Sequence, residues 1–298
     1  MTDPAVREWA GRAVPGARVV SCTVRPLAGG AVARCVEQLT LHLAGGQHRL
    51  ELVRKEASAH EIAGLRAAQA VRPQAPAVPE LVAAGPDWLI TPLAPGAPLA
   101  SGDLIPAGLL DSLAVVHARY PGGAGLPAAI PRVTGAWWQG LCRDWADPQL
   151  REHAARHPRA TTSRARALVS RAADLPAAAA VLAELPAVLL HGDVHPANVL
   201  VGNGQATLID WGSSRTGPAA LDLANLVPAG SAEVARYART WQLVTGQPLP
   251  AGPIERGYQW AALQIPVQYL PWTAARRSTA DVEAALDRIE RALEQLAD

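Results

Sequence analysis

The sequence predicts an α+β protein in two parts: an antiparallel β-sheet with one main helix, followed by a larger and mostly α-helical region. Two observations support this division. The first 93 residues contain runs rich in Val, Thr and Leu that are separated by Gly-Gly turns, as expected for antiparallel strands. From Pro95 onward, helical patterns are separated by prolines. We therefore place the sheet domain at residues 1–93 and the helical domain at residues 94–298.

The elements of the first part follow from local signals. Asp3 can cap a first helix that has Pro4 in its first turn. The turn Ala28-Gly29-Gly30-Ala31 joins two strands, and Gly45-Gly46 leads into a third strand, which ends at Lys55. The expected elements, in order, are a helix at 4–13, strands at 21–27, 34–43 and around 50–55, a helix at 57–70, and strands at 80–84 and 88–93.

The second part is expected to be a helical domain. Its last helix repeats apolar residues at helical spacing with charged residues between them, an amphipathic pattern that favours packing onto the domain. The apolar positions are Val282, Ala285, Ile289, Leu293 and Leu296. The expected helices cover 106–120, 134–146, 162–183, 218–227, 231–245, 253–265 and 279–297.

Composition restricts the environment and the partners. A formal net charge of +1 without a basic stripe argues against a nucleic-acid partner. Cys22, Cys35 and Cys142 have no CxxC spacing, so neither a disulfide framework nor a zinc ribbon is indicated, and the thiols fit a reducing compartment. The amino terminus lacks a signal-peptide pattern, and no apolar run reaches the roughly 18 to 20 residues of a membrane span. We expect a cytoplasmic protein with no membrane partner.

Lys55 is the only lysine in the chain, against 26 arginines. Lysine is a compact point charge whereas arginine is a planar fork, and one recurrent role of such a point charge is to bind nucleotide phosphates. Glu61 follows six residues later in a helical stretch and could pair with it. Arg54 competes for the role because adjacent strand residues point to opposite faces. The single lysine and its spacing to Glu61 favour Lys55.

Residues 188–212 combine a hairpin with oxygen-bearing side chains. Asn203-Gly204 is a strong hairpin signal, and counting outward from it places Asn198 opposite Ile209, one residue from Asp210. Strict alternation would put Asn198 and Asp210 on opposite faces unless the strand ends before Asp210. Such hard oxygen ligands suit Mg²⁺. With Asp193 in the same loop, the chain holds the parts that phosphoryl transfer requires: a carboxylate for the hydroxyl proton, two metal-holding groups and a lysine.

These motifs resemble those of the aminoglycoside phosphotransferase and choline kinase family, the small-molecule relatives of protein kinases. The stretch from His191 to Asn198, HGDVHPAN, resembles the family's catalytic loop, and Ile209-Asp210-Trp211-Gly212 resembles its metal-binding motif. Residues 88–96 resemble its hinge strand, and Leu221-Asp222-Leu223 resembles its acidic helix. The resemblance spans nearly the whole chain and implies a two-lobed kinase-like fold.

The resemblance also implies roles for single residues, with ATP or GTP and Mg²⁺ as cofactors. Asp193 would be the catalytic base or hydroxyl-orienting group, Asn198 and Asp210 the Mg²⁺ ligands, and Lys55 the phosphate contact held by Glu61. His191, His195 and Asp222 would support the catalytic loop. The hinge would offer adenine the carbonyl of Thr91 and the amide of Leu93, while Pro92, which lacks an N–H, falls between them. The Gly29-Gly30 turn would lie over the phosphates, although it departs from the protein-kinase G-x-G-x-x-G.

Parts of the sequence also fit other functions. His191 and His195 flank Asp193 and could form a zinc triad of a metal-dependent hydrolase. His153 and His157 are also four residues apart, but Ala154 stands where a zinc protease carries its glutamate. A nucleotide-binding pseudokinase module is a further alternative. A protein kinase is not favoured, because the stretch after Gly212 has no room for a long activation segment.

The acceptor is expected to be a small hydroxyl-bearing molecule whose identity stays open among sugars, amino alcohols, nucleosides and antibiotics. Residues 223–275 contain only Glu233 and Glu255 as acids, which argues against a polycationic aminoglycoside. Tyr258 and Trp260, with other aromatic residues nearby, could form a wall for a sugar or a quaternary ammonium group. They could equally be core residues.

Overall fold

The structure of the protein is a computed structural model that describes residues 3–27, 35–45, 49–100 and 102–297. By compactness the chain divides into two units. Unit 1 comprises Met1–Arg119, Gly125–Pro131 and His191–Ser214, and unit 2 comprises Tyr120–Ala124, Arg132–Leu190 and Arg215–Asp298. This grouping differs from the predicted division at residue 93, because unit 1 continues to Arg119 and includes residues 191–214, which follow several helices in the sequence.

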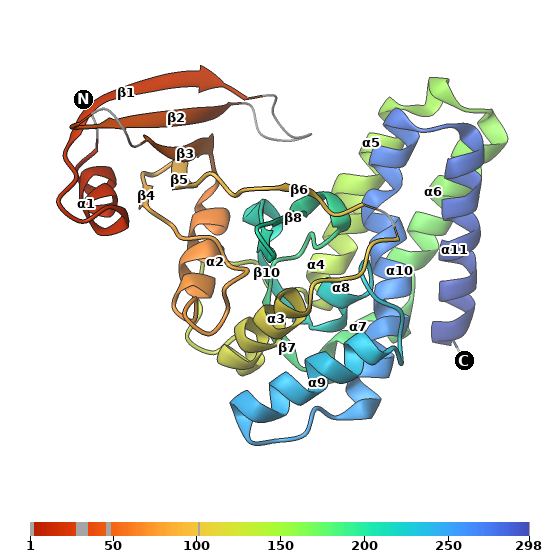
Figure 1. Ribbon diagram of the computed structural model, residues 1–298. Coiled ribbons are helices and arrows are strands. Elements are labelled where there is room, and N and C mark those ends of the chain that lie inside the picture. Colours follow the sequence, from red (N-terminus) through yellow and green to blue (C-terminus); the bar gives the residue numbers. More distant parts are fainter. Residues whose placement is uncertain (1–2, 28–34, 46–48, 101, 298) are drawn as a thin grey trace. The chain divides into compact units, whose positions relative to one another are not determined.

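A five-stranded antiparallel sheet organises unit 1, in the order β1-β2-β3-β5-β4 (Figure 1). Its first three strands form the predicted meander. The Gly29-Gly30 turn lies outside the described residues. The elements of this first segment are α1 (Pro4–Ala13), β1 (Val19–Pro26), β2 (Val36–Leu43), β3 (Arg49–Glu56), α2 (Ala59–Gln69), β4 (Ala83–Ala84), β5 (Trp88–Pro92), β6 (Ala97–Pro98) and α3 (Ala107–Arg119).

Apolar burial and capping explain the positions of α1 and α2. The Asp3 carboxylate accepts the N–H of Ala5, as the sequence predicts for the start of α1. Trp9 of α1 belongs to one apolar cluster with Leu41 and Leu52 of the sheet. The start of α2 is capped by the Ser58 hydroxyl, which accepts the N–H of Glu61 at 3.3 Å. This cap fixes where Glu61 stands, in the first turn of α2.

The rest of unit 1 is a loop and a tight hairpin. β8 (Val199–Gly202) and β9 (Gln205–Leu208) pair antiparallel, and β6 adds a third strand beside β8. The turn residues Asn203 and Gly204 both have positive φ, 52° and 75°, as a two-residue hairpin of this twist requires. The turn η4 (Pro196–Asn198) precedes the hairpin and the turn η5 (Trp211–Ser213) follows it.

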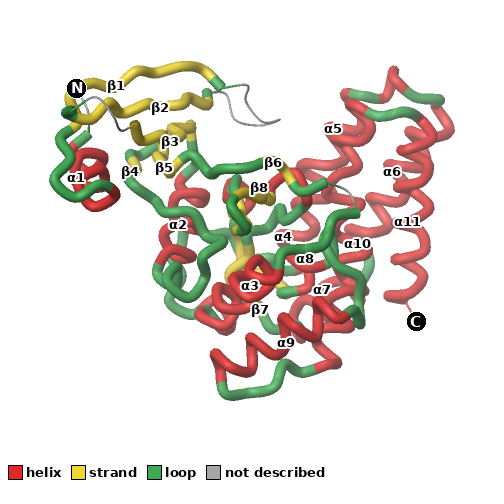
Figure 2. The backbone as a smooth tube through the Cα atoms, viewed as in Figure 1, coloured by secondary structure: helices red, strands yellow, loops and turns green. Residues whose placement is uncertain are grey.

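Unit 2 is mostly helical, with a two-stranded antiparallel sheet of β7 (Ala187–Leu190) and β10 (Arg215–Pro218). Figure 2 shows helix as the main element of this unit. As predicted, the last helix buries one apolar face, with Val282, Leu286, Ile289 and Leu293 at most 2% exposed. The remaining elements are η1 (Pro121–Gly123), α4 (Gly135–Gly140), η2 (Leu141–Ala146), α5 (Asp147–Glu152), η3 (Ala154–Arg156), α6 (Arg159–Asp174), α7 (Pro176–Glu184), α8 (Ala220–Leu223), α9 (Ala232–Thr245), α10 (Ala251–Arg276) and α11 (Thr279–Ala297).

Three predicted helices have different bounds. The helix expected at 162–183 is two helices, α6 and α7, because the chain leaves the helical region at Leu175 and restarts with Pro176. The helix expected at 218–227 is only α8, since residues 215–218 pair with β7 instead. The helix expected at 253–265 continues through Pro266 and Pro271 to Arg276.

Burial explains why α10 tolerates its prolines. A proline inside a helix costs about 3 kcal/mol or more. Yet Trp260, Leu263, Val267 and Leu270 of α10 are fully buried, and each large apolar side chain removed from water contributes about 1.5–3 kcal/mol. Although α10 is long, neither it nor any other helix among the described residues has the apolar stretch needed to cross a membrane.

Gly64 lies where α2 contacts η5, and this contact leaves no room for a Cβ atom. A Cβ at Gly64 would lie 2.3 Å from the Cβ and Oγ of buried Ser214. We predict that Gly64→Ala lowers the free energy of unfolding by roughly 1–3 kcal/mol, because overpacking outweighs the roughly 1 kcal/mol gain in helix propensity. Denaturant unfolding of the purified variant measures this change.

Gly11 provides the matched control, since it lies in α1 with no atom within 4 Å of its would-be Cβ. Gly11→Ala should stabilise the protein by about 0.4–1 kcal/mol. A stabilising effect of the same size at Gly64 would show that α2 does not lie against η5.

Candidate active site

The ammonium group of Lys55 lies between two carboxylates within unit 1. Its Nζ is 2.6 Å from Oε1 of Glu61 and 2.8 Å from Oδ1 of Asp210. Lys55 comes from β3, Glu61 from α2 and Asp210 from the residue before η5, so three separate segments meet at one charge. The Lys55 and Glu61 side chains are only 15% and 6% exposed, so water screens this pair weakly.

The three groups shift one another's protonation. Burial lowers the pKa of Lys55, but the Asp210 and Glu61 carboxylates raise that pKa by more, so it lies above its ordinary value. The pKa of Glu61 is raised, chiefly by burial and also by the Asp210 carboxylate, although Lys55 acts to lower it. The pKa of Asp210 is lowered, because Lys55 outweighs the effect of burial. At neutral pH Lys55 is therefore a cation and Asp210 an anion.

Arg54, the competing cation, points away from this cluster. It pairs with Glu37 at 3.8 Å, and its guanidinium lies 5.3 Å from the ring centre of Trp88. Alternation along β3 thus separates the two neighbours as expected. Lys55, and not Arg54, lies beside Glu61 and Asp210.

The hairpin brings Asn198 beside Asp210, as counting from its turn predicts. The Ile209 N–H donates to the Asn198 carbonyl at 2.9 Å. β9 ends at Leu208, and Asp210 has φ 64° and ψ 70°, in the left-handed region. This conformation is rare for residues other than glycine and occurs often at functional sites. It removes Asp210 from the strand alternation that would otherwise place it on the face opposite Asn198.

Asn198 is linked to Asp193 in the preceding loop. The amide nitrogen of Asn198 donates to the Asp193 main-chain carbonyl at 2.9 Å and to Asp193 Oδ2 at 3.3 Å. His195 Nε2 is 3.7 Å from the same carboxylate oxygen. The Asp193 and His195 side chains are 23% and 33% exposed, so the carboxylate is held on one side and accessible on the other.

His191 is a fully buried support of this loop. Its Nε2 lies 2.9 Å from the Ile209 carbonyl, and its Nδ1 accepts the Asp193 N–H at 3.3 Å. Since a carbonyl can only accept, these partners assign the proton to Nε2. The ring also packs edge-on against Trp211, with 4.9 Å between centroids. Both nitrogens are thus engaged, which does not fit the zinc triad considered from the sequence.

A second histidine, which sequence reasoning missed, joins α2 to η5. His60 Nε2 lies 2.6 Å from the Gly212 carbonyl. His60 directly precedes Glu61, and the Gly212 carbonyl belongs to the motif after Asp210. The one signal in the sequence is that His60 directly precedes Glu61, because a helix that positions Glu61 must itself be attached to the motif around Asp210.

The donor groups of Asn198 and Asp210 fit a magnesium ion. With its nitrogen bound to Asp193, Asn198 retains its amide oxygen, and Asp210 is a carboxylate with a 43% exposed side chain. Hard oxygen ligands, few in number, are what Mg²⁺ accepts when phosphates and water complete its shell. Among the described residues no group of three or more His, Cys, Asp or Glu could hold a metal, so a protein-only cage is not formed there.

The ladder between β3 and β5 corrects the predicted adenine contacts. The Leu93 amide donates to the Glu51 carbonyl at 2.9 Å and is therefore engaged within the sheet. Because alternate residues of an antiparallel strand direct their backbone groups to the same side, the Thr91 carbonyl faces β3 as well. The Pro92 carbonyl, at the alternate position, faces the other edge. The Thr91 carbonyl and the Leu93 amide, which the sequence assigned to adenine, are therefore directed towards β3.

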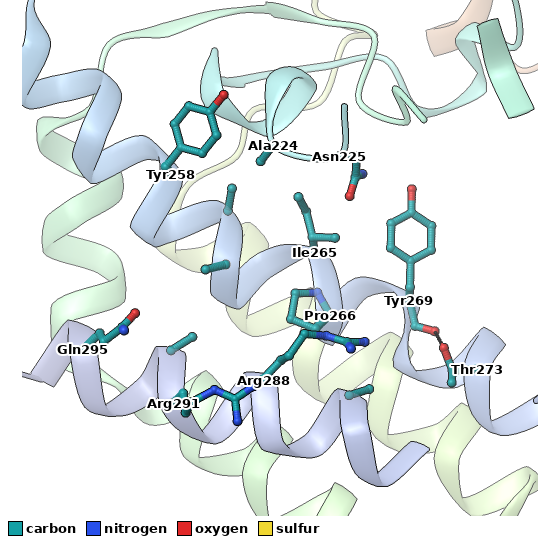
Figure 3. A pocket seen from close by; sticks show the side chains of 14 residues that line it. Ala224, Asn225, Tyr258, Ile265, Pro266, Tyr269, Thr273, Arg288, Arg291 and Gln295 are labelled. Carbon is teal, nitrogen blue, oxygen red and sulfur yellow. Dashed lines mark hydrogen bonds between the residues drawn. The ribbon is translucent and has the colours of Figure 1, made fainter. Parts of the chain in front are cut away.

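The remaining predicted residues lie in unit 2. Asp222 is fully buried in α8, and its role as support of the catalytic loop stays a prediction. Trp260 is also fully buried, where it packs edge-on against Trp138 and donates its ring N–H to Gln264. It belongs to the core and does not line a binding site. Tyr258, by contrast, lines a cavity (Figure 3).

Comparisons with known proteins bear on the family and the fold. The sequence model of the phosphotransferase enzyme family matches residues 23–263. A search of curated proteins found no match. Among solved structures, choline kinase from Cryptosporidium parvum Iowa II is similar with a TM-score of 0.60 at 12% identity, covering 92% of this chain and 88% of that one.

Two further structures are similar over nearly their full lengths. A choline/ethanolamine kinase family protein from Mesorhizobium loti has a TM-score of 0.52 at 16% identity, with 92% of both chains covered. Spectinomycin phosphotransferase, solved in complex with ADP and spectinomycin, has a TM-score of 0.51 at 12% identity, with 99% of this chain and 98% of that one covered. These similarities confirm the kinase-like α+β fold.

The two histidines of the loop should differ in their effect on stability. His191→Ala removes a fully buried ring and two hydrogen bonds, so we predict a loss of roughly 2–4 kcal/mol in the free energy of unfolding. His195→Ala, at a partly exposed position, should lose less than about 1 kcal/mol. Denaturant unfolding of both variants measures the difference, and equal losses would contradict the supporting role of His191.

Proposed function

The chain belongs to the phosphotransferase enzyme family and is a phosphotransferase with an alcohol group as acceptor, and we propose that it transfers the γ-phosphoryl group of ATP or GTP to a hydroxyl of a small molecule. This proposal rests on one observation, the contact of Lys55 with both Glu61 and Asp210. A lysine held by a helix glutamate beside a metal-binding carboxylate is the arrangement that phosphoryl transfer from a nucleoside triphosphate requires.

Each side chain has a definite task in this reaction. Lys55 binds the phosphates of the nucleotide, and Glu61 holds the Lys55 side chain in place. Asp193 accepts the proton of the acceptor hydroxyl, whose oxygen forms the new bond to the γ-phosphorus. The bond between that phosphorus and the β–γ bridging oxygen breaks, and the nucleoside diphosphate leaves with the electron pair. Because Asn198 donates to the Asp193 carboxylate, this group is oriented before the acceptor arrives.

Asn198 and Asp210 would hold magnesium. Held there, magnesium would supply positive charge that offsets the negative charge of the phosphates. The lowered pKa of Asp210 keeps this side chain in the anionic form needed of a ligand. In the structure the Asp210 carboxylate contacts Lys55 directly, so phosphates that bind Lys55 would compete with Asp210 for its ammonium group.

The edge of β5 and the residues after it are suited to a purine. The Pro92 carbonyl can accept from an exocyclic amine, and the Ala94 amide can donate to a ring nitrogen, which together match adenine. The solved spectinomycin phosphotransferase contains ADP, which is consistent with an adenine nucleotide here. We therefore favour ATP over GTP as the donor.

Asp193→Asn should abolish most turnover and leave folding intact. We predict a 10²- to 10⁴-fold lower rate, the range for loss of a general base, with unchanged melting temperature and nucleotide affinity. ADP release, stimulated by a panel of sugars, amino alcohols, nucleosides and aminoglycosides, provides the rate. Asp87→Asn, at an exposed loop position, serves as control and should match the wild type. A near-normal rate for Asp193→Asn would show that Asp193 is not the base.

Lys55→Arg should be damaging although the charge is kept. A guanidinium cannot contact Glu61, Asp210 and the phosphates from the position of an ammonium group, so we predict a loss of kcat of at least tenfold. Arg54→Lys should be mild, because Arg54 faces away from the cluster. Steady-state kinetics and melting curves of both variants test this prediction. Greater sensitivity at Arg54 would transfer the phosphate contact to that residue.

A further inference from the structure

His60 lies where α2 meets the segment that follows Asp210, and both segments belong to unit 1. Its partly buried Nε2 is 2.6 Å from the Gly212 carbonyl oxygen. Since a carbonyl can only accept, the ring proton is on Nε2. The proposed reaction assigns no task to this side chain, so the purpose of the contact is open.

Ser58 connects the His60 ring to the main chain of Glu61. The Ser58 hydroxyl oxygen lies 3.0 Å from His60 Nδ1 and 3.3 Å from Nε2. Because Nε2 donates to a carbonyl, Nδ1 is the nitrogen that can accept the hydroxyl proton. The same oxygen accepts the Glu61 N–H at 3.3 Å, as the N-cap of α2. The cap therefore orients the ring as well as the helix.

Gly212 carries the connection onward to Asp210. The Gly212 N–H donates to the Asp210 carboxylate, while its carbonyl accepts from His60. A Cβ at this position would lie 3.2 Å from Oδ1 of Asp210 and 3.5 Å from Oε2 of Glu61. Gly212 therefore lies beside both of the carboxylates that flank Lys55.

Glu61 and Asp210 are thus joined along two polar routes. The first is the Lys55 ammonium group, 2.6 Å from one carboxylate and 2.8 Å from the other. The second runs through the cap, the His60 ring and Gly212. Phosphates that bind Lys55 compete for the first route, because they use the same ammonium group. The second route does not include Lys55, so it persists when phosphates are bound.

We infer that His60 is a positioning residue for phosphoryl transfer, which acts by attaching α2 to Gly212. The attachment keeps Glu61 beside Asp210 while phosphates compete for Lys55. The inference rests on the proposed phosphotransferase function. Because Lys55 still joins the two acids in the free protein, loss of His60 should affect catalysis far more than stability.

Three substitutions of His60 test this role. His60→Gln keeps an N–H donor at the reach of Nε2, whereas His60→Asn places its amide one bond nearer the main chain, and His60→Ala removes the donor. The Ala and Asn variants should lose about 10- to 100-fold in kcat. The KM for ATP should change by less than about threefold. The Gln variant should keep at least about a third of the wild-type kcat, since its hydrogen bond is retained.

The rate is the release of ADP from ATP and Mg²⁺ with the acceptor of the panel that stimulates it most. Where none stimulates it, water serves as the acceptor and ATP hydrolysis is measured. Arg66→Ala is the matched control, because Arg66 lies in α2 with an exposed side chain. Its kcat should equal that of the wild type. Melting temperatures of all the single variants should stay within about 4 °C of the wild type.

A double-mutant cycle shows whether His60 acts through Glu61. Glu61→Gln weakens the ion pair with Lys55 and should lower kcat by itself. If the attachment serves only to place Glu61, then adding His60→Ala to Glu61→Gln should lower kcat by less than about threefold further. Arg66→Ala should have no effect in either background.

Hydrogen exchange of peptides from residues 57–70 provides a readout that does not depend on turnover. With the non-hydrolysable analogue AMP-PNP and Mg²⁺ bound, His60→Ala should exchange its first α2 amides at least about threefold faster than the wild type. Without nucleotide the difference should be smaller, because Lys55 then holds both acids.

A normal kcat for His60→Ala, equal losses in the Gln and Asn variants, or additive effects in the cycle would each overturn the inference. An exchange difference that is the same with and without the nucleotide would also overturn it. Failure of the proposed function is seen separately in the protein with His60 intact, as ATP binding that does not depend on Mg²⁺ and is unaffected by Asp210→Asn.

Discussion

The ion cluster of Lys55, Glu61 and Asp210 is the constraint on which the site depends. It joins a strand, a helix and the residue after a hairpin, which no continuous hydrogen-bonded element connects. Removing one member of a buried ion pair costs about 3–5 kcal/mol because it leaves an unpaired charge. The neighbouring contacts all reinforce this meeting point: His60 ties α2 to Gly212, and His191 ties the catalytic loop to Ile209. Catalytic geometry and stability of unit 1 thus rest on the same side chains.

Much of this site could be predicted from local sequence. Asn203-Gly204 specifies a hairpin turn, so simple counting gave the pairing of Asn198 with Ile209, and the lysine-to-glutamate spacing gave the ion pair. Both are short-range relations in which one strong signal determines the geometry. The α+β fold followed in the same way from strand and helix patterns, and the kinase-like fold that the motifs implied is confirmed by the family and structural comparisons.

What could not be predicted depends on longer-range packing. The register of β5 on β3 determines which backbone groups of β5 face β3 and which face the other side. The sequence around Pro92 is compatible with either register. The continuation of α10 past Pro266 reflects burial of the helix in unit 2, which outweighs local propensity. Likewise, Tyr258 and Trp260 are aromatic residues only two positions apart. Tyr258 lines a cavity, whereas Trp260 is enclosed by the core. Two arginines that line this cavity, Arg288 and Arg291, come from a different helix, α11.

The single lysine gives the protein an unusual chemical property. Lys55 carries the only side-chain amine in the chain, so acylating or reductively alkylating reagents have one side-chain target, and it is in the proposed nucleotide site. Only the neutral amine reacts, and the raised pKa of Lys55 keeps that form scarce while both carboxylates are in contact. The rate of labelling therefore reports the opening of one ion cluster, without an engineered probe and without background from other lysines.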